Sequence, residues 1–170
     1  MFDTFVDGGF SLLLRFGLPM LFALFVLKGA LIGKIFPTSV FLPGYIVAVS
    51  APDRLIVLSI AVASAGYVCG QLAIYLLAQR YGIEAIRSMP AVSLPEERLQ
   101  RANQIFHKYS GAGIFVTNLV PYVGTFVMIP AGIASYPFKR AAVYALLSTV
   151  LNYVLIVWFV LGSIQLLSAI

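Results

Sequence analysis

Polar side chains within long apolar stretches are the residues of this chain that could contact a ligand. Lys28 lies inside an apolar run, where its ammonium group either contacts a phosphate or extends to a nearby membrane interface. Gln71 and Tyr75 are four residues apart, which places them on one face of a helix. There they either bind a ligand or join two helices by hydrogen bonds. These residues offer hydrogen bonds and a positive charge, but no group for covalent chemistry.

The residue sets that carry covalent or metal chemistry are missing from the sequence. The single histidine, His107, cannot build a zinc site, and the single cysteine, Cys69, cannot form a disulfide framework. The sequence has no phosphate-binding glycine loop, and its apolar stretches contain no paired carboxylates. We therefore expect a protein that is not an enzyme and that holds no metal or cofactor.

The composition excludes a soluble globular protein. Of the 170 residues, 61% are hydrophobic and 10% are charged, whereas soluble domains have about 25% charged residues. A soluble surface built from this chain would lack polar groups to face water, so we expect a single-domain, all-α integral membrane protein. Lys and Arg exceed Asp and Glu by 11 to 6. Because these basic residues lie between apolar runs, their expected partners are lipid headgroups and not nucleic acid.

Three segments are long and apolar enough to cross a membrane: residues 9–33, 55–79 and 141–168. At ~1.5 Å per residue, a helix of such length covers the ~30 Å hydrocarbon core. Two further apolar segments, 35–52 and 112–134, are interrupted by proline, which removes a backbone donor and clashes with the preceding turn. We expect each of these two to form a re-entrant helical hairpin. The residues expected to shape the hairpins are Pro37, Pro43, Gly44, Pro121, Gly124, Pro130 and Gly132.

The two interrupted segments resemble each other. Thr38 precedes Pro43 by five residues and Thr125 precedes Pro130 by five, with a glycine shortly after each proline. Interrupted segments at corresponding positions of two halves indicate the midplane binding site of a transporter. The alternative is a pair of kinked helices that pack without forming a site. On the hairpins, polar side chains either satisfy freed backbone groups or contact a ligand.

The distribution of charge predicts an orientation in the membrane. Residues 80–110 are expected to form a cytoplasmic amphipathic helix between an N-terminal half, 9–79, and a C-terminal half, 112–168. If 112–134 is a hairpin, this linker shares one face with Lys139 and Arg140, and that face carries seven of the 11 basic residues. The positive-inside rule makes it cytoplasmic, with Lys139 and Arg140 as interface anchors. Lys28, Lys34 and Arg54 would then face outward.

The chain resembles the DedA family, the bacterial and archaeal relatives of the eukaryotic VTT-domain lipid scramblases. In the C-terminal half, the family's frame is matched by Asn118-Leu-Val-Pro121-Tyr-Val-Gly124, followed by Ala131-Gly132 and the basic pair. In the N-terminal half, the segment from Gly70 through Gln71 and Tyr75 to Gly82 matches a second motif, and 37–39 corresponds to a Pro-x-Glu motif. The resemblance covers roughly residues 10–165 and implies three spans and two facing hairpins in an inverted repeat.

The charged positions of that family are neutral in this chain. The family's acidic pair corresponds to Ser39 and Gln71, or to Tyr45 and Gln71 in a second alignment. The family's arginines correspond to Asn118, Gly124 and Gln79, and Arg80 follows Gln79 by one place. Amides and hydroxyls cannot take up and release protons as a buried carboxylate does, so we expect the family's proton coupling to be lost. The candidate substrate-binding residues are Lys28 and the remaining polar set: Thr38, Ser39, Gln71, Tyr75, Asn118, Tyr122 and Thr125.

The resemblance implies lipid translocation. A flippase or scramblase of the cytoplasmic membrane would move a phospholipid or polyprenyl-phosphate headgroup through a narrow cavity between the hairpins, either alone or as a homo-oligomer. Two alternatives remain open: a small-ion or small-solute transporter that uses the same cavity, and a non-transporting membrane assembly partner.

Overall fold

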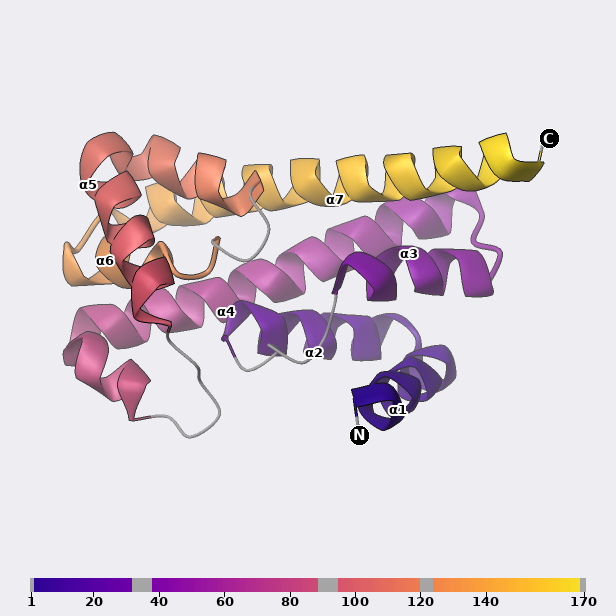
Figure 1. The fold of residues 1–170 in the computed structure, drawn as a ribbon, viewed down its shortest axis with the longest axis horizontal. Helices are drawn as coiled ribbons and strands as arrows, with labels where there is room; N and C mark the ends of the chain where they lie inside the picture. Colours follow the sequence, from indigo (N-terminus) through magenta and orange to yellow (C-terminus); the bar gives the residue numbers. More distant parts are fainter. Residues whose placement is uncertain (1, 32–37, 89–94, 120–123, 169–170) are drawn as a thin grey trace.

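The regular structure of the chain is helical throughout the part that the computed structural model describes (Figure 1). This part comprises residues 2–31, 38–88, 95–119 and 124–168, with side chains except those of 2–7, 38–40 and 168. The helices are α1 (Phe2–Phe16), α2 (Leu18–Gly29), α3 (Thr38–Ala48), α4 (Asp53–Arg87), α5 (Glu96–Leu119), α6 (Met128–Ile133) and α7 (Phe138–Ser168).

Helices α4 and α7 are the two helices, among the described residues, that are long and apolar enough to cross a membrane. They correspond to the expected spans 55–79 and 141–168. Helix α4 continues beyond the expected end to Arg87, and it bends at Gly82, whose φ of 72° lies in the left-handed region that glycine tolerates. The prediction of one amphipathic helix over 80–110 is therefore wrong, because its first residues belong to α4.

The expected first span, 9–33, is not one helix. The chain turns at Gly17, where φ is 61° and ψ is −134°, and Pro19 opens the new helix α2. Helices α2 and α3 then run in opposite directions (Figure 1), and their outer ends are close: a Cβ added to Gly17 would lie 3.4 Å from the Tyr45 hydroxyl. The N-terminal hairpin is therefore formed by α2 and α3, and the segment 35–52 supplies only its second arm.

The C-terminal hairpin lies close to its predicted bounds. Helix α5 breaks at Ser110, where φ is 47°, and its second part, from Gly111 to Leu119, forms the first arm. After a turn over 124–127, α6 returns as the second arm. The two ends of the hairpin are close together, because a Cβ on Gly111 would lie 2.3 Å from the hydroxyl oxygen of Tyr136, three residues beyond α6.

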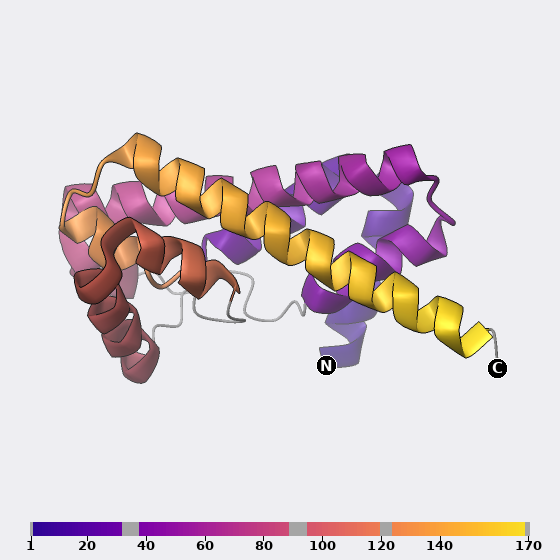
Figure 2. The ribbon, with the colours of Figure 1, turned by 90° about the horizontal axis from the view of Figure 1, so that it is seen from above.

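The described part of each half of the chain contains four elements in the same order. In each half an amphipathic segment, α1 or the first part of α5, precedes two hairpin arms and one long helix. Helix α2 packs on the long helix of its own half, α4, and α5 packs on α7. Of the second arms, α6 contacts the long helix of the other half, α4, whereas α3 contacts both α4 and α7. The open ends of the two hairpins lie at opposite ends of the molecule (Figures 1 and 2).

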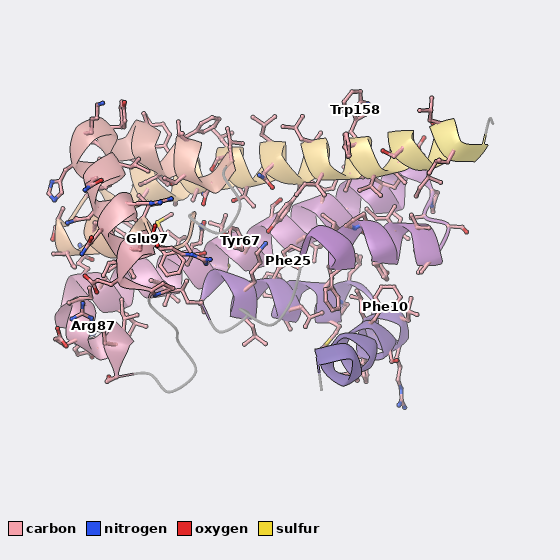
Figure 3. The ribbon with its side chains drawn as sticks, in the orientation of Figure 1. Phe10, Phe25, Tyr67, Arg87, Glu97 and Trp158 are labelled. Carbon is pink, nitrogen blue, oxygen red and sulfur yellow. The ribbon has the colours of Figure 1, made fainter. Side chains whose placement is uncertain are left out.

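The first part of α5 lies across the end of the molecule where α4 ends and α7 begins (Figure 1). Its apolar face is formed by Leu99, Ala102 and Phe106, which are buried. Arg87, labelled in Figure 3, bridges Glu84 at 3.3 Å and Glu96 at 3.0 Å, and so links α4 to α5. The seven basic residues expected to share one membrane face lie on these three elements, which meet at one end: Arg80, Arg87, Arg98, Arg101, Lys108, Lys139 and Arg140.

Glycines allow the backbones of α2 and α4 to touch. A Cβ added to Gly70 would lie 2.2 Å from the carbonyl oxygen of Val26, and one added to Gly29 would lie 2.1 Å from that of Tyr67. A Cβ added to Gly66, four residues before Gly70, would lie 2.6 Å from the carbonyl oxygen of Phe22. Small residues at this spacing let helices approach closely enough for extensive dispersion contacts, which drive helix association in lipid.

Substituting Gly70 by alanine should therefore destabilise the protein. Because the obstructing atoms are backbone, they cannot move aside as a flexible side chain would, and we expect the free energy of unfolding to fall by about 1–3 kcal/mol. The measurement is denaturant unfolding of the purified protein in detergent. Gly162→Ala in α7 is the matched control, since a Cβ there has no atom within 4 Å; it should be neutral or stabilise by up to about 1 kcal/mol. Equal effects of the two substitutions would contradict the packing argument.

Candidate functional site

A buried hydrogen-bonded network joins α4, α5 and α7 at the centre of the molecule. The Gln71 side-chain nitrogen donates to Oδ1 of Asn118 at 2.7 Å, and Nδ2 of Asn118 donates to Oγ of Ser148 at 3.0 Å. Gln71 and Ser148 are fully buried and Asn118 is 7% exposed. Neutral groups of this kind can be buried at moderate cost because each finds a partner. Gln71 and Asn118 thus pair with each other.

The end of the first arm of the C-terminal hairpin is held by α7. Asn152 donates to the backbone carbonyl oxygens of Asn118 at 3.3 Å and Leu119 at 3.2 Å. The last carbonyl groups of a helix have no partner within the helix, and side chains commonly supply one. Asn152 therefore satisfies backbone groups that the end of α5 leaves unpaired.

Tyr67 of α4 contacts both hairpins. Its hydroxyl forms a 3.0 Å hydrogen bond with Oγ1 of Thr125, in the turn before α6, while Nζ of Lys28, in the last turn of α2, lies 5.0 Å from the centre of its ring. Thr125 is 5% exposed. The two hairpins are thus connected through one side chain, close to the midpoint of α4 (Figure 3).

Three aromatic rings surround the Lys28 ammonium. Besides Tyr67, the rings of Phe25 on α2 and Tyr153 on α7 each have their centre 5.8 Å from Nζ. The face of an aromatic ring is negative, so it attracts an ammonium group within about 6 Å. Tyr67 and Tyr153 lie near the middle of α4 and α7, so Lys28 is close to the centre of both long helices. Its expected outward position in a membrane stays a prediction.

The candidate Tyr75 lies apart from this centre. Its hydroxyl donates to the backbone carbonyl of Tyr136 and accepts a 3.3 Å hydrogen bond from Gln79, and its ring packs edge-on against Phe138. These contacts fasten α4 to the start of α7. The structure thus supports the helix-joining interpretation of Tyr75, whereas a ligand contact there stays a prediction.

The glycines and prolines of the hairpins lie in close contacts. A Cβ on Gly132 of α6 would lie 2.4 Å from the carbonyl oxygen of Tyr75, so the second arm touches the backbone of α4. A Cβ on Gly124 would lie 2.1 Å from Oδ1 of Asn118, so the amide occupies the space that a larger residue at 124 would need. Pro43 and Pro130 lie inside α3 and α6, and Gly44 packs against the Phe10 ring.

Several predicted residues lie outside what the structure describes. Pro37, Pro121 and Tyr122 fall in the ranges that are not described, and for Thr38 and Ser39 only the backbone is, in the first turn of α3. The cavity expected between the hairpins would be lined in part by those residues and stays a prediction. Lys139 and Arg140 are exposed in the first turn of α7, at the basic end.

A pocket of about 220 Å³ lies at the basic end of the molecule, away from the central network. Parts of α4, α5 and α6 line it, including Arg87, Gln100 and Pro130. None of the substrate-binding candidates contributes to its lining. The polar centre and this pocket are therefore separate features.

Four residues of the centre are absent from the set predicted from the sequence. Tyr67, Ser148, Asn152 and Tyr153 all contact a predicted residue. A signal was available for two of them, because Ser148 and Asn152 are polar residues four apart in the last apolar span, and so share a face.

The network should contribute to stability through the Gln71–Asn118 pair. Replacing Asn118 by leucine removes its side-chain bonds and leaves Gln71 buried without this partner, so the free energy of unfolding should fall by about 1–3 kcal/mol. A double-mutant cycle with Gln71→Leu should give a coupling energy of about 0.6–1.7 kcal/mol, the range of interhelical hydrogen bonds in membranes. The exposed Asn103→Leu on the same helix is the control and should be near neutral. A coupling energy of zero would show that the two amides do not stabilise each other.

The sequence of this chain matches a known protein family over most of its length. The family model of the VTT domain, which is the domain of the DedA family, matches residues 18–163. The match begins at the first arm of the N-terminal hairpin and ends within α7. Neither the comparison with curated proteins nor that with solved structures found a match. Because the family model covers most of the sequence, including both hairpins and both long helices, the chain belongs to the VTT domain family.

Proposed function

We propose that this protein is a membrane transporter that moves a lipid headgroup across the bilayer as a flippase or scramblase. The observation that carries the proposal is the double contact of Tyr67, which joins Lys28 of one hairpin to Thr125 of the other near the midpoint of α4. Membership of the VTT domain family supports a role in membrane transport.

The two hairpins would be re-entrant, each entering and leaving the membrane on one side, while α4 and α7 cross it. Backbone that stops at membrane depth is tolerated where it is buried in protein or lines a wet cavity, because unpaired backbone groups are costly in hydrocarbon. The arms α2 and α6 rest on α4, and Asn152 satisfies carbonyls at the end of α5. A polar path between the hairpins needs to admit only a headgroup, since the acyl chains stay in the lipid.

Movement through this site would not be coupled to protons in the way the family's carboxylates allow. The pair Gln71 and Asn118 can exchange hydrogen bonds with a headgroup but cannot carry protons between the two sides. We propose passive transport in both directions. The basic end, with the first part of α5 and the start of α7, would face the cytoplasm of a cell membrane by the positive-inside rule.

The proposal can be tested with the purified protein in liposomes that contain a lipid with a fluorescent headgroup. Reduction of the dye from outside measures the fraction of lipid that reaches the outer leaflet. We expect rapid loss of more than half of the signal, at a rate that does not change when a pH gradient is imposed. Thr125→Ala and Asn118→Ala should slow the process at least about tenfold, because each removes a polar contact worth ~1.4 kcal/mol or more in the site.

Asn103→Ala serves as the matched control and should transport at the wild-type rate. A signal that stops at half, as in empty liposomes, would contradict lipid movement and would favour the assembly-partner alternative. Entry of a small solute without lipid movement would favour the solute transporter. A rate that depends strongly on the pH gradient would contradict passive transport.

A further inference from the structure

We infer that the first part of α5, residues 96–109, is a gate over the second hairpin, which Arg87 holds shut and which turns at Ser110. The inference rests on the proposed function and deepens it, because the gate would control how a headgroup reaches the site from the basic end. Three features of this end carry the inference: a strained bend, an incompletely filled contact and an ion pair between two helices.

The bend in α5 is strained. Ser110 has φ of 47° and ψ of −121°, a backbone conformation that residues with a side chain rarely adopt. Such a residue costs free energy and persists only where the surrounding structure fixes it. Beyond the bend, the second part of α5 is anchored beside α7 (Figure 1), because Gly111 packs against the Tyr136 hydroxyl and the Tyr144 ring. The first part can therefore turn about Ser110 while the second part stays in place.

The contact between the first part of α5 and the second hairpin is incompletely filled. The pocket of about 220 Å³ lies here, with Leu99 and Gln100 of α5 on one side and Ile129 and Pro130 of α6 on the other. Protein interiors are close-packed, and side chains that line an empty space lose the dispersion contacts that a filled one would give. The first part of α5 is therefore held against α6 less firmly than a fully packed helix would be.

An exposed ion pair fastens the far end of the gate. Arg87, near the end of α4, donates to Glu96 in the first turn of α5 at 3.0 Å, and these side chains are 44% and 60% exposed. Exposed ion pairs contribute little stability and are screened by salt. The bridge between Arg87 and Glu96 is thus a latch that favours the closed position but can be released.

Helix α6 connects the gate to the centre of the molecule. It begins three residues after Thr125, whose hydroxyl is bonded to Tyr67, and its Gly132 packs against the backbone of α4. Ile129 and Pro130 line the pocket on the side of α6 that faces the gate. Opening the gate would free this side of α6, so that the second arm and Thr125 could shift relative to α4. A movement at the basic end would then reach the point where the two hairpins meet.

The experiment measures the distance between two nitroxide labels, one on each side of Ser110, by electron double resonance on the full-length protein in lipid nanodiscs. Gln104→Cys and Val116→Cys introduce the labels at exposed positions, and Cys69→Ala removes the native cysteine. We expect a main closed distance and a minor open one. Arg87→Gln removes the latch and should raise the ratio of open to closed molecules about threefold to tenfold.

Matched variants separate the latch from a general effect of charge. Glu96→Gln should open the gate as Arg87→Gln does, and the double variant should open it no further, because both remove the same bridge. Arg101→Gln and Glu84→Gln are the controls, since each removes an ion pair within one helix; each should change the ratio less than about twofold. Raising the salt concentration from about 50 to about 500 mM should open the wild type more than Arg87→Gln.

The inference is overturned if Arg87→Gln shows the same label distances as the wild type, or if Arg101→Gln opens the segment equally. In the liposome assay, Arg87→Gln should speed lipid movement about twofold or more, because more molecules are open. Lengthened label distances with lipid movement at the wild-type rate would overturn the gate and leave the transporter. Label distances that respond to Arg87→Gln in a protein that moves no lipid would leave the latch and remove the transporter.

Discussion

The close approach of helix backbones along α4 is the contact on which the rest of the structure depends. Gly66 and Gly70 let α2 pack closely against one stretch of α4. Gly132 lets α6 pack closely against the following stretch of α4, at Tyr75. Gln71 lies between these two stretches. The position of each hairpin along α4 is therefore set by glycines, and the polar residues become neighbours because both hairpins are fixed to one helix. In lipid, where burial of apolar surface adds little, such backbone contact is a main source of association.

The neutral centre follows from the same packing. An arginine at position 124 would compete for the space that the Asn118 amide fills, so the amide and the glycine form one consistent arrangement. Gln71 then meets an amide instead of a charge, and Ser148 completes the network. Lys28, on a different element, α2, lies close to this centre, with Nζ 5.0 Å from the centre of the Tyr67 ring.

Much of this architecture could be predicted from the sequence, and the errors have physical causes. The long spans 55–79 and 141–168 and the interrupted segment 112–134 were recognisable because apolar length and proline act locally. The first hairpin was not recognisable from the sequence, because Gly17 and Pro19 interrupt an apolar run that looks continuous by composition alone. A turn at one glycine depends on the backbone conformation that the fold imposes, and hydropathy does not report it. The partners of Lys28 and Thr125 were missed for a related reason: Tyr67 and Tyr153 are ordinary apolar-span residues until the hairpins are placed against them.

The common order of elements in the two halves has a consequence for insertion. Each half offers an amphipathic segment, two hairpin arms and one long helix, so the order of elements gives the insertion machinery little reason to prefer one direction. The difference between the ends resides in side chains, chiefly the seven cations on the last turns of α4, on α5 and on the first turn of α7. These exposed charges would then decide the direction in which the whole protein is inserted into the membrane.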